Sequence, residues 1–319
     1  MPIRKTFLVV LLFVGCMGIS SVAQAAADIP VTSMSHVKVV TVPNVSATPN
    51  GGSSVNCSNL GALCELGTVA YCVKVDSTDS VAVLYKVKNI EGTIGAQSIT
   101  STPIKTASGS VVSLGHANGM ASYQGSLYIA SGKALVGENS QIFKVSTVGV
   151  IEGKYKVRDS NGQERRVLAI SSFRNDQFLL RLDPVGGVSS TYREYAAASI
   201  GSDGYFEIQK YFTVPVVDAY ELTQDIYYSG GRMYLVSNAK SEQGYTVYNR
   251  IQVINLSAVL IDGGVYYPEE YLQDNSIGET TEKYELESMF IGSTGKIYAC
   301  ANAVFSSVGS DGVYCLERR

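Results

Sequence analysis

Tryptophan is missing from this 319-residue sequence, and histidine occurs only twice, as His36 and His116. Two histidines in different repeats exclude a metal site built on several histidines of one repeat. A Ser-His-Asp triad would have to use His116, and no Gly-x-Ser-x-Gly turn supports it. Neither a His-Glu-x-x-His motif nor a glycine motif for phosphate or dinucleotide binding is present. The common signatures of these enzyme classes are therefore absent.

Clusters of basic residues are missing as well. The formal net charge is −3, with 25 Lys and Arg against 28 Asp and Glu. Because a basic patch supplies most of the affinity for nucleic acid, no nucleic-acid partner is expected. No segment shows the period of a long amphipathic helix. Tyrosine, in contrast, occurs 21 times, and it suits half-buried strands because its ring packs while its hydroxyl stays solvated.

The apolar run at the N-terminus predicts export. A positively charged start precedes an apolar core over residues 7–19, and Ala23-Gln-Ala has the small residues of a cleavage site. A membrane anchor would need about 20 apolar residues, so residues 1–25 are interpreted as a signal peptide. Val14-Gly-Cys also resembles the end of a lipobox, so lipidation of Cys16 stays open. We expect a secreted or periplasmic protein without a membrane span.

A hairpin pattern returns along the rest of the chain. Its second strands begin at Leu127, Phe178, Met233 and Ile297, which lie 51, 55 and 64 residues apart. A diverged copy at Tyr71 lies 56 residues before Leu127. Four-stranded propeller blades usually span about 40 to 50 residues, so longer loops are expected here. The five copies predict an all-β, five-bladed β-propeller over residues 57–319.

The same pattern predicts where the strands lie. The inner strands are expected near residues 117–123, 168–173, 224–228 and 286–291. Residues 26–56 form an N-terminal segment in which 36–43 alternates well enough to be a strand that closes the propeller by completing its last blade. The acidic stretch from 268 to 285 is interpreted as a solvated loop. We expect a single propeller domain and a monomer.

Five cysteines follow residue 25, and export would permit disulfides. None has the Cys-x-x-Cys spacing of zinc or redox sites. Cys300 and Cys315 lie in predicted neighbouring strands of the last repeat, so they are the expected disulfide. The pairing of Cys57, Cys64 and Cys72 stays open. Because the count is odd, at least one thiol is free or pairs between chains.

Polar residues recur where the predicted inner strands begin. Aligning the repeats places these residues at one level: Asn118, Ala169, Gln224 and Glu287. Such a rim could bind a sugar or a phosphate ester, or a divalent cation through oxygen ligands. Polar residues at strand starts also simply satisfy backbone groups and hold water. The candidate ligand-binding residues are His116, Asn118, Gln224, Asp225 and Glu287, with no cofactor beyond an optional cation in the channel.

Side-chain parity separates two roles among these residues. Strand side chains repeat with a period of two, so Asn118, Gln224 and Glu287 should converge on the channel. Gly119, Asp225 and Ser288 should then point between blades. A carboxylate there must be hydrogen-bonded or paired. We expect Asp225 to be a structural clasp rather than half of a cation site with Glu287.

Three short motifs resemble the helveticin J-like family. They are Gly115-His-Ala-Asn-Gly-Met with Leu127-Tyr-Ile, Gln224-Asp-Ile before a strand, and Glu285-Leu-Glu-Ser-Met with Gly295-Lys-Ile-Tyr. Their order matches the second, fourth and fifth repeats of that family. The family includes exported bacterial proteins, some described as large heat-labile bacteriocins, and is related to teichoic-acid biosynthesis protein C. The resemblance implies a five-bladed propeller with a bacteriocin-like or envelope-glycan-associated role.

Two functions are compatible with these features. The first is binding of a cell-surface or envelope ligand, a glycan or polyanion, through the channel mouth. The alternative is a metal-assisted hydrolase or lyase that acts on a sugar or phosphodiester. A deep channel with converging Asp225, Glu287 and His116 would favour the enzyme. A shallow channel with exposed tyrosines on the rim would favour the binding protein.

Overall fold

The computed structural model contains strands and no helix in the part of the chain that it describes. The described ranges are 29–132, 141–174, 176–183, 191–216, 221–241, 246–275, 283–305 and 308–319. Within them, no helix is long and apolar enough to cross a membrane. The signal peptide predicted over residues 1–25, with Cys16, lies outside the described residues.

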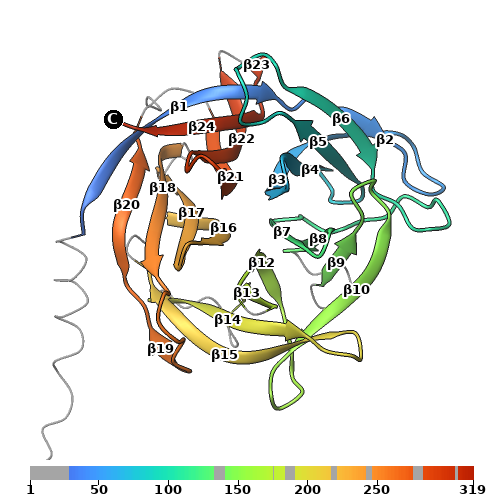
Figure 1. The fold of residues 1–319 in the computed structure, drawn as a ribbon. Coiled ribbons are helices and arrows are strands. Elements are labelled where there is room, and N and C mark those ends of the chain that lie inside the picture. The colour runs from blue at the N-terminus through green and yellow to red at the C-terminus, as the bar shows by residue number, and fades with distance from the viewer. Residues whose placement is uncertain are drawn as a thin grey trace, which may run out of the picture.

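Five blades of four antiparallel strands surround a central axis (Figure 1). From the axis outward, blade 1 is β3 (Val55–Leu66), β4 (Val69–Asp76), β5 (Ala82–Lys88) and β6 (Ser98–Pro103). Blade 2 is β7 (Gly119–Tyr123), β8 (Ser126–Ala130), β9 (Ile142–Val145) and β10 (Ile151–Arg158). Blade 3 is β12 (Val167–Ser172), β13 (Gln177–Leu182), β14 (Tyr192–Ile200) and β15 (Tyr205–Pro215).

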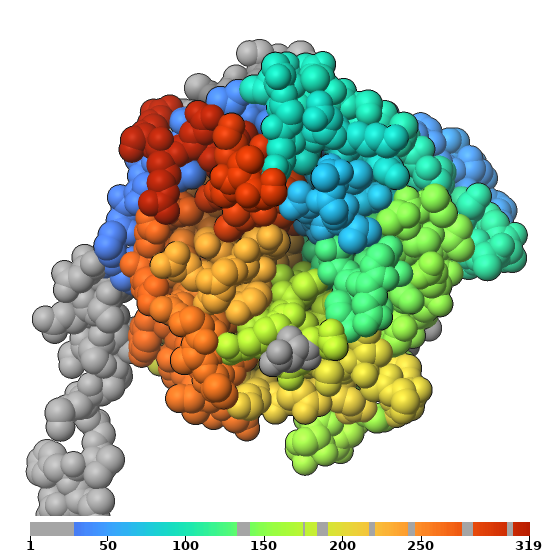
Figure 2. Space-filling model, viewed as in Figure 1, coloured from blue at the N-terminus to red at the C-terminus, as the bar shows by residue number. Residues whose placement is uncertain are grey.

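Blades 4 and 5 complete the ring, and Figure 2 shows the sectors packed around one centre. Blade 4 is β16 (Glu221–Ser229), β17 (Arg232–Lys240), β18 (Thr246–Asn255) and β20 (Pro268–Asp274). Blade 5 is β21 (Lys283–Ile291), β22 (Ile297–Phe305), β24 (Gly312–Arg318) and β1 (Val31–Thr41). Short strands at the edges are β2 (Val45–Ala47), β11 (Glu164–Arg165), β19 (Gly264–Val265) and β23 (Val308–Gly309). The predicted five-bladed β-propeller is confirmed.

The N-terminal strand closes the ring. In β1, Met34 lies opposite Arg318 and Thr41 lies opposite Gly312 of β24, so the two strands are antiparallel. The closing strand expected over 36–43 is therefore formed as part of β1. The same strand also runs parallel to β20 of blade 4, with Val31 beside Tyr271. The stretch expected to be an acidic loop begins with β20, so that interpretation is wrong for residues 268–274; strand pairing to β18 outweighs their charge.

The core lies between neighbouring blades. One cluster joins residues of blades 1 and 5, such as Leu63 and Phe290, and another joins blades 3 and 4, such as Leu179 and Leu235. This arrangement explains why the inner strands are apolar on both faces, since each face packs against another sheet. The second strands carry a tyrosine at one equivalent position in four blades: Tyr71, Tyr128, Tyr234 and Tyr298. Tyr71 is thus equivalent to Tyr128, so the predicted match of Tyr71 with Leu127 is wrong by one residue.

The inner strands begin at one end of the molecule, here called the channel mouth. The connections between second and third strands lie at this end too, because adjacent strands are antiparallel. The opposite end, here called the basal face, holds the turns between first and second strands, and the outer strands run along the perimeter of the ring (Figure 1). The first strands β3, β7, β12, β16 and β21 contact one another in a closed ring around the axis.

A β-bulge interrupts four inner strands at the same level near the mouth. The register shifts lie between Leu60 and Ala62, Val167 and Ala169, Thr223 and Asp225, and Leu286 and Ser288. The extra residues are Gly61, Leu168, Gln224 and Glu287. A bulge redirects the side chain of its extra residue and bends the strand. The repeated bulge therefore sets which residues can face the channel.

Candidate functional site at the channel mouth

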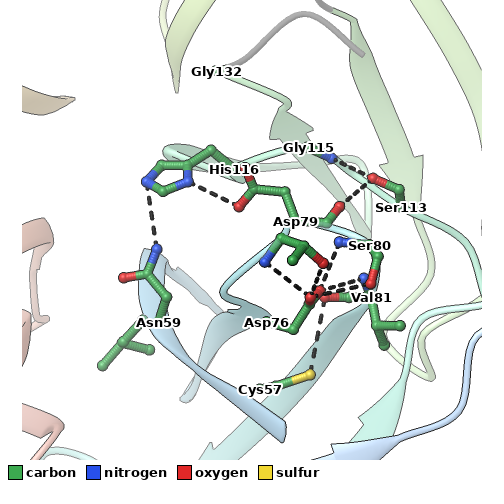
Figure 3. A network of polar contacts seen from close by, with 12 residues as sticks. Cys57, Asn59, Asp76, Asp79, Ser80, Val81, Ser113, Gly115, His116 and Gly132 are labelled. Atoms are coloured by element: carbon green, nitrogen blue, oxygen red, sulfur yellow. Dashed lines mark hydrogen bonds and ion pairs between the residues drawn. The ribbon is translucent and has the colours of Figure 1, made fainter. Parts of the chain in front are cut away.

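A tight loop between β4 and β5 begins the site. The Asp76 carboxylate accepts hydrogen bonds from the backbone N–H groups of Thr78, Ser80 and Val81 at 3.0, 2.6 and 2.7 Å. It also accepts from the hydroxyls of Thr78 and Ser80. These bonds lower the pKa of Asp76 although burial opposes them. The loop is thus locked in the shape that presents Asp79 to the mouth (Figure 3).

Asp79 orients His116, which comes from the segment before β7. Nδ1 of His116 lies 3.0 Å from Oδ1 of Asp79. The backbone N–H of His116 donates to Ser131 O at 2.7 Å, which ties the segment to the end of β8. The His116 side chain remains 43% exposed, whereas that of Asp79 is 10% exposed. The buried Asp79 carboxylate therefore fixes the orientation of the imidazole, whose other side is open to solvent.

A chain of polar contacts continues from His116 into blade 5. A carboxylate can only accept, so Nδ1 of His116 donates to Asp79 and Nε2 accepts from Asn59 Nδ2 at 3.4 Å (Figure 3). Asn59 Oδ1 accepts from Asn302 Nδ2 at 2.9 Å, and Asn302 Nδ2 also lies 2.8 Å from Glu287 Oε1. The contacts thus connect blades 2, 1 and 5 across the mouth.

Asn302 holds the inner strands of blades 5 and 1 together. Its Oδ1 accepts from the N–H of Leu60 at 2.8 Å, and its Nδ2 lies 3.1 Å from Leu60 O. Asn238, at the equivalent position of β17, donates in the same way to Leu286 O at 3.3 Å. A buried amide that bonds the next blade is thus a repeated feature of this propeller.

Glu287 has an unusual charge state. Burial is the main cause that raises the pKa of its carboxyl to about 8, and the nearby Glu285 adds to it. Glu285 itself is ion-paired with Lys240 and Lys283. At neutral pH the Glu287 carboxyl is therefore mostly protonated. Since Oε1 accepts from Asn302, the proton lies on Oε2, which can donate to a ligand.

The predicted ring residues share one level, with one exception. Gln224 and Glu287 are the bulged residues of β16 and β21, and Asn118 directly precedes Gly119, the residue equivalent to Asp225 and Ser288. The prediction for blade 3 is wrong, because the bulge places Leu168 at this level and moves Ala169 one position on. Convergence of the Asn118, Gln224 and Glu287 side chains stays a prediction, whereas the contacts above join Glu287 to His116.

Asp225 fills the axis one level below. The other four residues at this level are small: Ala62, Gly119, Ala169 and Ser288. A Cβ on Gly119 would collide with Asp225 Oδ1 and lie 3.0 Å from the Cα of Ala169, so glycine makes room for the carboxyl. Asp225 therefore reaches from blade 4 to blade 2 rather than lying only between adjacent blades.

The contacts of Asp225 make it a clasp between blades. Its Oδ1 accepts from the N–H of Ile226 at 2.7 Å, and its Oδ2 contacts the Ser288 hydroxyl, which lies 3.0 Å from Leu63 O. Burial raises the pKa of Asp225 well above its usual range. Burial favours the protonated form of this carboxyl, which can donate to Ser288 while the Ser288 hydrogen goes to Leu63 O. This chain links blades 4, 5 and 1.

The predicted disulfide is wrong. The five cysteines of the described chain are buried and free: Cys57, Cys64, Cys72, Cys300 and Cys315. Cys300 lies opposite Val313 and Cys315 lies opposite Tyr298, so the two cysteines are diagonal neighbours two residues out of register. Diagonal neighbours on paired strands lie about 7 to 8 Å apart, farther than the roughly 4 Å between the Cβ atoms of a disulfide.

No group of three or more His, Cys, Asp and Glu side chains able to hold a metal gathers among the described residues. Burial raises the pKa of both Asp225 and Glu287, the pair considered for a cation.

Sequence reasoning missed Asn59, Asp79 and Asn302. The Asp76-Ser-Thr-Asp-Ser sequence is a turn signal between two strands, which could have marked Asp79 as a loop-presented carboxylate. Asn302 recurs as Asn238 in the equivalent strand, and a repeated amide in an otherwise apolar run is a sign of a buried clasp. Asn59 carries no signal, because only the approach of blades 1 and 2 brings it to His116.

Models of known protein families give no match to this chain, and neither do curated protein sequences. Among solved structures, the fold is similar to α-L-arabinofuranosidase from Lactobacillus brevis, at 8% identity over 83% of this chain and 92% of that one, with a TM-score of 0.47. The GH43_1 enzyme from Xanthomonas citri complexed with xylose has 10% identity over 94% and 92%, with a TM-score of 0.45. The tail fiber of Staphylococcus aureus phage P68 has 12% identity over 89% and 52%, with a TM-score of 0.44. At these values the likeness indicates neither substrate nor activity.

Proposed function

We propose that this protein is an exported propeller that binds a neutral glycan at its channel mouth. The observation that carries the proposal is the chain of contacts from Asp79 through His116, Asn59 and Asn302 to Glu287. It offers donors and acceptors side by side, as sugar hydroxyls require. Asn302 is satisfied within the protein, so the groups left for a ligand are the exposed face of the His116 ring, the second N–H of the Asn59 amide and the Glu287 hydroxyl.

The charges at the mouth favour a neutral ligand over a polyanion. Glu287 is protonated, and the neighbouring cations Lys240 and Lys283 are both paired with Glu285. A polyanion would need unpaired cations to replace its counterions. Kinship with the helveticin J-like family and an envelope location are part of this proposal.

Glycoside hydrolysis is the second candidate, and one observation favours it. A carboxylic acid that keeps its proton at neutral pH is what a glycosidase uses to protonate the leaving oxygen. Glu287 meets this requirement. The reaction also needs a second, ionised carboxylate on the other side of the bond, and Asp79 is committed to His116 while burial raises the pKa of Asp225 and disfavours its ionised form. Binding without cleavage is therefore the primary proposal.

The Glu287→Gln variant separates the two candidates. Glutamine reproduces the neutral, donating form of the carboxyl, so binding should persist while acid catalysis should be lost. His116→Ala should weaken binding about tenfold, or roughly 1.4 kcal/mol, because it removes the ring face that packs against a sugar and the partner that orients the Asn59 amide. The exposed Gln209 of β15 provides a control, since Gln209→Ala leaves the mouth untouched.

The measurement is binding of the purified full chain to an array of neutral and anionic glycans, followed by titration calorimetry on retained glycans. Reducing-end release is assayed on the same glycans. Loss of cleavage with retained affinity in Glu287→Gln would establish the hydrolase. Unchanged affinity of His116→Ala, or retention of polyanions alone, would contradict the proposed site.

A further inference from the structure

A narrow slot lies between blades 3 and 4 at the channel mouth. Tyr195 of β14 and Gln252 of β18 are buried residues of its lining, and Arg193 and Thr223 are half-buried at its edge. Arg193 lies near the start of β14 and Thr223 near the start of β16, and both strands begin at the mouth. The free volume is about 10 Å³, which holds one group the size of a water molecule. The slot therefore admits a single small group from the mouth side.

Two buried polar atoms of the slot lining lack a hydrogen-bond partner. Within the described chain, no group bonds the Tyr195 hydroxyl or Gln252 Oε1, although Tyr195 is 0% exposed and Gln252 only 5%. The charges of Arg181, Arg193 and Glu221 act on the Tyr195 hydroxyl, so it faces the part of the slot that Arg193 and Glu221 line. Leaving a buried polar atom unpaired costs free energy. Such a pair of atoms therefore marks the place of a bound group.

Glu221 fixes the orientation of the Gln252 amide. A carboxylate can only accept hydrogen bonds, so the atom of Gln252 that lies 3.2 Å from Glu221 Oε1 is the amide nitrogen. Gln252 Oε1 therefore points away from Glu221 and needs a donor. The charge of Glu221 is balanced by Arg250, whose Nη1 lies 3.1 Å from Glu221 Oε2.

The two unpaired atoms define the chemistry of the group that fits between them. Gln252 Oε1 requires a donor, and the Tyr195 hydroxyl has a hydrogen to donate to an acceptor. A hydroxyl group meets both requirements at once. A carboxylate would have no hydrogen for Gln252 Oε1, and an ammonium group would meet the positive charges of Arg181 and Arg193. The slot is therefore suited to one neutral hydroxyl.

We propose that the slot takes the hydroxyl of the exocyclic hydroxymethyl group of a hexose unit, which makes the protein selective for hexoses over pentoses and 6-deoxyhexoses. The inference rests on the proposed binding of a neutral glycan at the mouth. A hydroxyl on the sugar ring could enter only together with the ring, for which the slot is too small. The hydroxymethyl group carries its oxygen one carbon beyond the ring. Thr223 directly precedes Gln224, which shares its level in the ring with Glu287, so the slot and the contacts around His116 border the same mouth.

The test uses pairs of glycans that differ only in this group. One pair ends in a glucoside or the matching xyloside, and the other ends in a galactoside or the matching 6-deoxygalactoside. Titration calorimetry with the purified full chain measures both members of each pair. We expect the native protein to bind the hexose member about tenfold more tightly, as one added hydrogen bond allows. Tyr195→Phe should bring this ratio close to one and leave the affinity for the xyloside and the 6-deoxygalactoside unchanged.

Two further variants control for the loss of a buried hydroxyl and for the shape of the slot. The Tyr271 hydroxyl is also buried and without a partner among the described residues, but Tyr271 does not line the slot. Tyr271→Phe should therefore keep the native ratio. Thr223→Ile narrows the slot, so it should weaken binding of the hexose members alone. The melting temperature of each variant shows whether it is folded.

The outcomes separate this inference from the proposed function. Equal affinity of the native protein for both members of each pair overturns the inference, and so does an equal change of the ratio in Tyr195→Phe and Tyr271→Phe. The slot would then hold one structural water, while glycan binding that depends on His116 would still stand. Retention of no glycan by the native protein would contradict the proposed function and this inference with it.

Discussion

Glu287 shows how burial changes the chemistry of one residue. Its carboxyl has an ordinary pKa of 4.5 when exposed, and the fold raises the pKa to about 8. The folded protein therefore binds a proton that the unfolded chain releases between these two values. At low pH this proton stabilises the folded state and so increases the free energy of unfolding. That contribution is lost as the pH rises through about 8.

We expect the melting temperature of the protein to fall as the pH rises from about 5 to about 9, and Glu287→Gln to flatten this dependence. Scanning calorimetry across that range measures it. Part of the slope should remain in Glu287→Gln, because burial raises the pKa of Asp225 as well. A variant with the unchanged slope of the native protein would show that Glu287 is ionised in the folded state.

Asp225 should tolerate an amide but not a truncation. Asparagine keeps the oxygen that accepts from Ile226 and gains an N–H that can donate to Ser288, so Asp225→Asn should stay within about 1 kcal/mol of the native stability. Asp225→Ala removes both bonds, leaving the Ile226 N–H unsatisfied and the Ser288 oxygen without its donor, which should cost about 1–3 kcal/mol. Urea unfolding of the native protein and the two variants measures these differences in the free energy of unfolding. A large loss in Asp225→Asn would mean that the carboxylate is charged and paired.

At the scale of the element, β1 determines whether the ring stays closed. It is the outer strand of blade 5 and also pairs with β20 of blade 4, so it spans the point where the two ends of the chain meet. Met34 in this strand is buried in the cluster that also contains Leu316 and Tyr314. Loss of the strand would expose the edge of β24 to solvent.

Removal of residues 1–41 should therefore lower the melting temperature strongly and promote association through the open edge of β24. Removal of residues 1–28 should leave the melting temperature unchanged, because all strands of the five blades follow that point. Circular dichroism melts and light scattering compare the two truncations. Equal melting temperatures of the two truncated proteins would show that blade 5 is stable with three strands, without β1.

For the whole molecule, the buried cysteines report on global unfolding. They lie in the core between blades, and burial raises the pKa of Cys57 to about 11 and that of Cys72 to about 12. Thiols that are both inaccessible and protonated are poor nucleophiles. Their reactivity therefore depends on the blades separating.

An aromatic disulfide reagent at pH 8 should react with none of Cys57, Cys64, Cys72, Cys300 and Cys315 in the native protein within minutes, and with all of them in denaturant. Absorbance of the released thiolate counts the reactive groups. The control is the same titration after full reduction. A lower count before reduction than after it would mean that some of these cysteines are paired.

The sequence determined the architecture by itself. The hairpins around Leu127, Met233 and Ile297 repeat a strand–turn–strand pattern at intervals of more than 50 residues. One such hairpin cannot bury its apolar faces alone, so the copies must pack against one another. The strand at 36–43 followed from the same logic, since its alternation had no partner nearby in the chain. The inner-strand positions of Gln224 and Glu287 were also available from this alignment.

Only the tertiary structure decided how the site is assembled. Asn59, Asp79, His116, Asn302 and Glu287 come from three blades, and no local pattern encodes contacts over such separations. The β-bulge that moves Leu168 into the ring and Ala169 out of it depends on pairing to β13. The same holds for the thiols, because a register offset of two residues keeps Cys300 and Cys315 apart on adjacent strands. The raised pKa values of Glu287 and Asp225 follow from burial, which exists only once five blades close around them.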